Sequence, residues 1–189
     1  MLAAQNGHGK VVGKLLDAKA TVDQQAGNDA TALILAAQNG HGEIVAKLLA
    51  AKATVDQQDE NDATALMMAA ENGHGKVVDK LLDAKATVDK QDRNGATALM
   101  LAAMNGHGEI VDKLLAADAT VDKQDENGVT ALISATFNGR DEVVDKLLAA
   151  DATVDKHAAN GATALSIAQA RNHADVVQIL RRHIGPFTR

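Results

Sequence analysis

The seven histidines are the residues of this sequence best suited to chemistry, because an imidazole can bind a metal ion or move a proton near neutral pH. Four of them, His8, His41, His74 and His107, recur at one constant interval along the chain. Packed helices lie about 8–10 Å apart, whereas a metal lies about 2 Å from its nitrogen ligands. Equivalent histidines in neighbouring repeats therefore cannot share an ion, and we expect each to hydrogen-bond to loop backbone between units. Arg140 takes this position once, which suits a structural role.

Residues 7–14, Gly-His-Gly-Lys-Val-Val-Gly-Lys, contain the glycines and lysines typical of a phosphate-binding loop. Their spacing does not fit the P-loop, which needs glycine where His8 stands and serine or threonine where Leu15 stands. It does not fit the dinucleotide-binding pattern either, which needs glycine where Val12 stands. This stretch is therefore a repeat junction.

The remaining candidate nucleophiles are also unpromising. Ser134 and Ser166 are the only serines, and neither lies in a Gly-x-Ser-x-Gly turn. The chain has no cysteine, which excludes a thiolate nucleophile, a thiolate metal site and a disulfide framework, and which fits a reducing compartment. We expect a protein that is not an enzyme, holds no cofactor or metal, and is cytoplasmic.

Charge and hydropathy exclude further classes. The formal net charge is −6, whereas a dedicated nucleic-acid binder needs a basic surface to gain from counterion release. No run of about 18 apolar residues is available for a membrane-spanning helix. The first residues lack a basic segment followed by a long apolar one, so no secretory signal is expected. We therefore expect neither nucleic acid nor membrane as a partner.

The elements that position these residues form an internal repeat. Thr-Ala-Leu recurs at a constant interval from Thr31 to Thr163, and a Leu-Leu pair follows at the same interval. We expect one array over residues 1–184 and a tail at 185–189. Its units are 1–23, 24–56, 57–89, 90–122, 123–155 and 156–184.

Residues 90–122 show what one unit does. Asn94-Gly95 favours a turn, and Thr97 can cap a short helix that continues to about Asn105. A second helix is expected from about Gly108 to Ala117, with apolar residues on one face. Such short helices are unstable alone in water, so neighbouring units must supply the missing burial. The sequence predicts a one-dimensional stack.

The repeat has a period of 33 residues and consists of a turn and two helices. Its first helix contains Thr-x-Leu-x-x-Ala-Ala, Gly-His lies between the helices, and the second helix contains Ile-Val-x-x-Leu-Leu. Together these features resemble the ankyrin repeat family. The resemblance recurs in every unit. It implies an all-α fold, an ankyrin-type α-solenoid of stacked helix-turn-helix units joined by extended hairpin loops.

Three departures from the family pattern recur in the copies. Alanine replaces the usual proline after the capping threonine, as at Ala98, and an apolar residue such as Met100 replaces the usual histidine. Lysine or aspartate follows the second helix where the family favours glycine. If that position keeps a left-handed backbone, each such residue costs up to about 1 kcal/mol. The residues are Lys19, Lys52, Lys85, Asp118 and Asp151.

The resemblance also implies a binding surface, because partners of ankyrin stacks generally use the turn tips and first helices that line a concave face. At the tips the sequence varies as Gly27, Glu60, Arg93, Glu126 and Ala159. Late in the first helices it varies as Gln5, Gln38, Glu71, Met104, Phe137 and Ala170. The candidate partner-binding residues are Glu60, Glu71, Arg93, Met104, Glu126 and Phe137.

Phe137 is the only aromatic residue inside the array, and two interpretations of it stay open. It can form an exposed apolar patch with Met104, rimmed by Glu71, Arg93 and Glu126, as an anchor with a polar rim would. It can instead fold inward over small alanine neighbours.

Four arginines make the C-terminal end basic, at Arg171, Arg181, Arg182 and Arg189. They can keep a terminal helix soluble, or they can form a basic partner-binding patch. For the whole chain, the first hypothesis is a monomeric, non-enzymatic module that binds a protein partner. The alternative is an engineered or structural repeat scaffold with no dedicated partner.

Overall fold

The computed structural model describes residues 1–184, so the tail at 185–189, with Arg189 of the basic cluster, lies outside the described residues. The described chain forms helices in pairs. The first helix of each pair is odd-numbered: α1 (Leu2–Gln5), α3 (Ala32–Gln38), α5 (Ala65–Glu71), α7 (Ala98–Asn105), α9 (Ala131–Phe137) and α11 (Ala164–Ala170). The second is even-numbered: α2 (Gly9–Asp17), α4 (Gly42–Ala50), α6 (Gly75–Asp83), α8 (Gly108–Ala116), α10 (Asp141–Ala149) and α12 (Ala174–Ile184).

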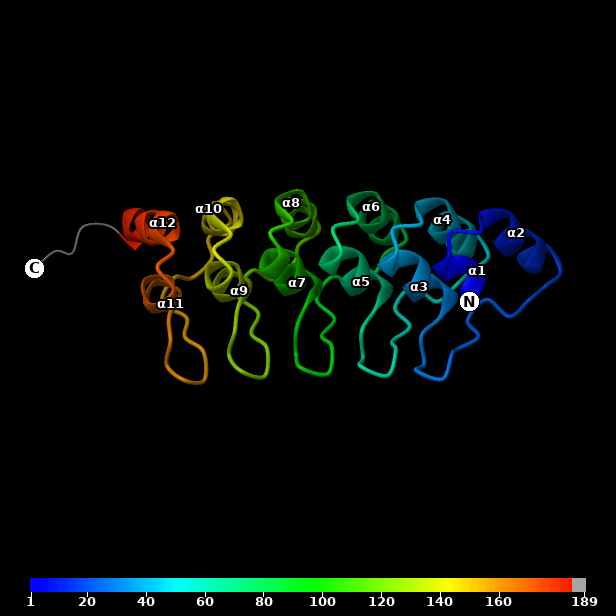
Figure 1. The fold of residues 1–189 in the computed structure, drawn as a ribbon, viewed down its shortest axis with the longest axis horizontal. Helices are drawn as coiled ribbons and strands as arrows, with labels where there is room; N and C mark the ends of the chain where they lie inside the picture. Colours follow the sequence, from blue (N-terminus) through cyan, green and yellow to red (C-terminus); the bar gives the residue numbers. More distant parts are fainter. Residues whose placement is uncertain (185–189) are drawn as a thin grey trace, which may run out of the picture.

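The helices lie in two rows. Odd-numbered helices pack side by side, and the even-numbered helices form a second row against them. Hairpin loops project from the odd-numbered row, on the side away from the even-numbered row (Figure 1). This arrangement confirms the predicted all-α, ankyrin-type solenoid.

Capping threonines start the odd-numbered helices from α3 onward. In α7 the Thr97 hydroxyl accepts a hydrogen bond from the Met100 N–H at 3.3 Å, as predicted, and the same bond recurs in α3, α5, α9 and α11. The cap satisfies a helix N–H that would otherwise lack a partner. Met100 itself is buried, so apolar packing does replace the polar network of the family's usual histidine.

The core runs the length of the stack and is built from small residues. In α7 the predicted inward residues Leu99, Ala102 and Ala103 are at most 1% exposed. In α8 the residues Ile110 and Leu114 are at most 2% exposed, and they pack in the same continuous cluster. Because alanine lacks a long side chain, the odd-numbered helices can approach closely. No helix among the described residues is both long and apolar enough to cross a membrane.

The backbone is left-handed after five of the even-numbered helices, at residues that are not glycine. Their φ angles lie between 61° and 65°, at Lys19, Lys52, Lys85, Asp118 and Asp151. The sequence alone did not decide whether these residues adopt the left-handed conformation. A side chain in the left-handed region costs about 1–2 kcal/mol relative to glycine, so each of these ends carries strain.

Adjacent hairpins are joined by a column of aspartates and threonines that the sequence analysis did not single out. The Thr54 N–H donates to the Asp23 carboxylate at 3.0 Å, and the Thr54 hydroxyl donates to it at 2.7 Å. The same pairing recurs one repeat further on, between Thr87 and Asp56, and then twice more. Each unit from 24–56 to 123–155 is thereby hydrogen-bonded to the one before it.

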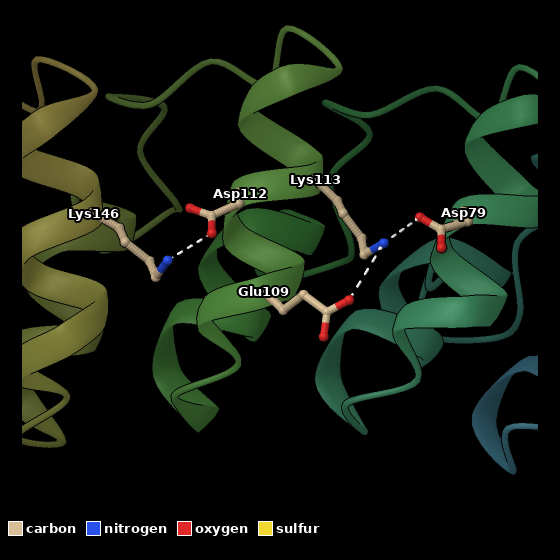
Figure 2. Close-up of polar contacts among 5 residues, drawn as sticks. All are labelled: Asp79, Glu109, Asp112, Lys113 and Lys146. Carbon is tan, nitrogen blue, oxygen red and sulfur yellow. Dashed lines mark hydrogen bonds and ion pairs between the residues drawn. The ribbon is translucent and has the colours of Figure 1, made fainter.

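Ion pairs link the even-numbered helices (Figure 2). Lys113 on α8 lies 2.6 Å from Asp79 on α6, and Lys146 on α10 lies 2.6 Å from Asp112 on α8. Glu109 contacts Lys113 from within α8 at 3.5 Å. The hydrogen bond to Asp79 raises the pKa of Lys113 above its ordinary value of 10.5, although partial burial opposes the shift. The pKa of Lys146 is raised in the same way by Asp112.

Candidate functional site

The repeated histidines hold neighbouring units together. His41 Nε2 lies 2.9 Å from the Gln5 carbonyl oxygen, and the same contact to the preceding unit is made by His74 and His107 at 3.0 Å. Arg140 takes over this role and donates from Nε to the Met104 carbonyl at 3.2 Å. The expectation of a structural role is confirmed for these residues.

His173 belongs to the same column, although the sequence analysis did not assign it there. It follows Arg140 by one repeat and contacts the Phe137 carbonyl oxygen at 3.3 Å. Among the residues that the structure describes, no group of three or more histidine, aspartate or glutamate side chains is placed to hold a metal ion.

A hollow of about 320 Å³ lies at the start of α2 and α4, on the glycine-rich stretch considered above. Two of its donors are engaged within the chain. Lys47 donates to the Gly9 carbonyl at 2.9 Å, and His41 contacts Gln5. Lys10 also lines the hollow, but the negative charge of Glu43 in the same lining disfavours a phosphate.

The hairpin tips form a regular row. The Glu60 N–H donates to the Asn28 carbonyl at 3.0 Å, and the Glu126 N–H donates to the Asn94 carbonyl at 3.0 Å. Arg93 is held in the same way and also hydrogen-bonds through its guanidinium to the Glu60 carbonyl. The backbone of each tip is thus fixed by its neighbour, while the side chains of Glu60, Arg93 and Glu126 are exposed.

The ends of the first helices supply the apolar part of this surface. Met104 at the end of α7 is 36% exposed, and Phe137 at the end of α9 is 45% exposed. Phe137 therefore does not fold inward over its alanine neighbours. Its ring is covered on one face by Arg171, whose Cζ lies 3.3 Å from the ring centroid in a cation–π contact.

Met104 and Phe137 line one open hollow of about 390 Å³ between the first helices and the hairpins. Asp125 and Val129 come from the hairpin before α9, and Ile167 comes from α11. The walls are largely apolar, and Asp125 is the only charged residue among them. We call this feature the α9 hollow, and it is lined by Met104, Asp125, Val129, Ile133, Ser134, Phe137, Asn138, Ala158, Asn160, Ala162 and Ile167.

The structure thus brings together only part of the predicted set. Met104 and Phe137 share the α9 hollow, and Glu126 follows Asp125 of its lining. Glu60 and Arg93 are neighbours in the row of tips, and Glu71 uses its backbone carbonyl to bind His107. The part these residues play in binding stays a prediction.

The contributors to this region that were not predicted include Asp125, Ser134 and Arg171. A signal was present for Ser134, because the equivalent position in other units holds a large apolar residue such as Leu101 or Ile167. The contact of Arg171 with Phe137 had no such signal, since it depends on the rotamers of two side chains in adjacent units.

Comparison with known families agrees with this architecture. A family model described as ankyrin repeats, three copies, matches residues 1–92 and again residues 75–158. No curated protein matches the chain. The two matched ranges together cover most of the 189 residues, and they include the helix pairs from α1 to α10. The chain belongs to the ankyrin repeat family.

Proposed function

We propose that residues 1–184 form a single array that acts as a monomeric, non-enzymatic module and binds a protein partner through its hairpin face. This face consists of the hairpin tips and the exposed ends of the odd-numbered helices. Ankyrin repeats are generally protein–protein interaction modules, which gives the proposal its general class.

The observation that carries the proposal is the exposure of Phe137 at 45% beside Met104 at 36%. A monomeric protein rarely leaves large apolar side chains clustered on its surface without a use. Aromatic and methionine side chains are enriched in protein interfaces, where a polar rim surrounds the apolar centre. Here Glu126 and Arg93 supply exposed charges on nearby tips.

Site-specific photocrosslinking tests the proposal. A photoreactive amino acid placed at Glu71, Met104 or Glu126 is expected to give a saturable crosslink to a defined protein in cell extract. The same amino acid at Glu43 or Glu109, on even-numbered helices, is the matched control and is expected to give none. These control positions are exposed, as Met104 and Glu126 are, whereas Glu71 is half-buried.

Competition decides whether such a crosslink is specific. Unlabelled wild-type chain is expected to abolish it, and unlabelled Phe137→Gln, which copies Gln38 of an earlier unit, is expected to compete at least about tenfold less well. Equal crosslinking from both rows of helices would contradict the proposal. A failure to saturate at any position would instead favour a repeat scaffold with no dedicated partner.

A further inference from the structure

The α9 hollow exists because this region departs from the chain's own repeat. Ser134 lines it, whereas the equivalent position holds Met68 and Leu101 in the two preceding units. The smaller side chain leaves space over α9. On the next hairpin Ala158 stands where the preceding units have aspartates, which leaves that wall free of a charged side chain.

Other departures at the same place make the walls more apolar. Val129 replaces the alanine found at Ala63 and Ala96, and Phe137 replaces the glutamine found at Gln38. Val129 and Phe137 both line the α9 hollow. The differences from the repeat thus place a smaller side chain over α9 and larger apolar side chains beside it. Together they form a pocket that suits an apolar group.

The size of the α9 hollow limits what it can hold. Its volume of about 390 Å³ lies at the low end of the range of about 300–1,000 Å³ typical of ligand pockets. One or two bulky side chains fill such a space. Arg171 covers one face of the Phe137 ring and so holds the ring beside the hollow.

The hairpin side of the α9 hollow is acidic. Asp125 Oδ1 accepts hydrogen bonds from the N–H groups of Asn127 and Val129, both at 2.8 Å. Among the described residues no hydrogen bond reaches Asp125 Oδ2, which stays available as an acceptor. The adjacent Glu126 is exposed, no lysine or arginine lines the hollow, and the chain carries a net charge of −6.

We propose that the α9 hollow binds a bulky apolar side chain of a protein segment that carries a lysine or arginine next to that side chain. The apolar group displaces water from the space over Ser134, against Met104 and Phe137. The cation pairs with the Asp125 and Glu126 carboxylates at the hairpin side. This inference rests on the proposed function and specifies the chemistry of the partner.

Short labelled peptides test the inference with the full-length chain. The parent peptide has a central phenylalanine flanked by lysines, one variant has alanine at the centre, and another has glutamates as flanks. Fluorescence anisotropy measures the three dissociation constants. Loss of the phenylalanine is expected to weaken binding about tenfold, since a buried anchor carries most of the affinity. The glutamate flanks are expected to weaken it about fivefold at low salt and much less at about 1 M salt, where charges are screened.

Filling the α9 hollow gives the decisive variant. Ser134→Leu copies Leu101 of the preceding unit, so the variant is expected to fold with unchanged helicity. It is expected to abolish the preference for phenylalanine over alanine at the centre of the peptide. Met68→Leu, at the equivalent position two units earlier, is the matched control and is expected to preserve that preference.

Two results would overturn the inference: equal binding of the lysine- and glutamate-flanked peptides, or an undiminished phenylalanine preference in Ser134→Leu. The crosslinking experiment separates this failure from failure of the proposed function. Suppose that the crosslinks from Met104 and Glu126 form and unlabelled wild-type chain abolishes them, but one of these two contrary peptide results is obtained. The hairpin face then binds a partner of different chemistry. If the crosslinks are absent as well, the proposed function fails too.

Discussion

Many positions of the repeat carry the same contact in successive units, so a residue that departs from its counterparts can be compared with them. Thr136 on α9 is such an exception, since Ala37, Ala70 and Ala103 occupy its position in the preceding units. Thr136 is fully buried, and among the described residues its hydroxyl is the buried side-chain group left without a hydrogen-bond partner. An unsatisfied buried polar group costs about 1–3 kcal/mol.

Thr136→Val is therefore expected to raise the free energy of unfolding by about 1 kcal/mol, because valine keeps the shape and removes the hydroxyl. Urea denaturation followed by circular dichroism measures the change. The control is Thr130→Val, which removes the cap from the Ile133 N–H and is expected to destabilise by about 1 kcal/mol. Equal losses of stability in the two variants would contradict the assignment of Thr136 as unsatisfied.

Lys85 offers a second test at this scale, because its φ is 65°. Lys85→Gly is expected to stabilise by up to about 1 kcal/mol, since the relief of left-handed strain exceeds the extra entropy of glycine in the unfolded chain. Lys80→Gly within α6 is the control and is expected to destabilise by about 1 kcal/mol. Chemical denaturation distinguishes the two. A loss of stability in Lys85→Gly would show that this position is not strained.

Helices are positioned by contacts that recur with the period of the sequence, as the ion pairs between α6, α8 and α10 do (Figure 2). Lys80 occupies the same position on α6 as Lys113 on α8, yet Ala46 stands on α4 where an aspartate would complete the pair. Ala46 precedes Lys80 by the same interval by which Asp79 precedes Lys113. The series of ion pairs therefore lacks an aspartate on α4, and it lacks another on α2, where Gly13 precedes Lys47 by the same interval.

Ala46→Asp is expected to form a new ion pair with Lys80 and to raise the melting temperature slightly at low salt. The gain is expected to vanish near 1 M salt, where the screening length falls to about 3 Å. Ala50→Asp, one turn further along α4 and in its last turn, is the control that adds the same charge. Equal effects of the two substitutions would show that charge, rather than pairing, is responsible.

The existing pairs predict a pH dependence of stability. Because the pKa of Lys113 is raised in the folded chain, its pairing with Asp79 stabilises below pH 10.5 and is lost as the pH rises through the folded-state value. Wild type is therefore expected to be more stable than Asp79→Asn at pH 7 and at pH 9, with a smaller difference at a third pH above 10.5. Urea denaturation at these three pH values measures it. A difference that grows at alkaline pH would contradict the pairing.

The elements show what the sequence could and could not predict. Thr97 and Gly108 marked the starts of α7 and α8, because capping and turn residues act locally. The histidine contacts followed from the period together with the spacing of helices. The α9 hollow did not follow, because it depends on how Ser134, Ala158 and Phe137 from two adjacent units combine in space. The hydrophobic periodicity that predicts helices and strands carries no information on how side chains from different units combine in space.

The whole molecule is a linear stack in which neighbours supply what each helix pair lacks. Histidine, aspartate and lysine side chains bond across junctions between units, as at His107, Asp56 and Lys113. The odd-numbered helices bury alanines against one another, so every unit depends on the next for its core. The hairpin face stays open because packing uses only the surfaces between units.

The dependence of each unit on its neighbours is the central claim, and isolating one unit tests it most directly. A synthetic peptide of residues 90–122 contains α7, α8 and one hairpin arm, and circular dichroism compares its thermal unfolding with that of the full chain. We expect the peptide to be largely unfolded and to lack a cooperative transition, because its helices are too short to persist alone. A helical peptide that melts cooperatively, as the full chain does, would contradict the account.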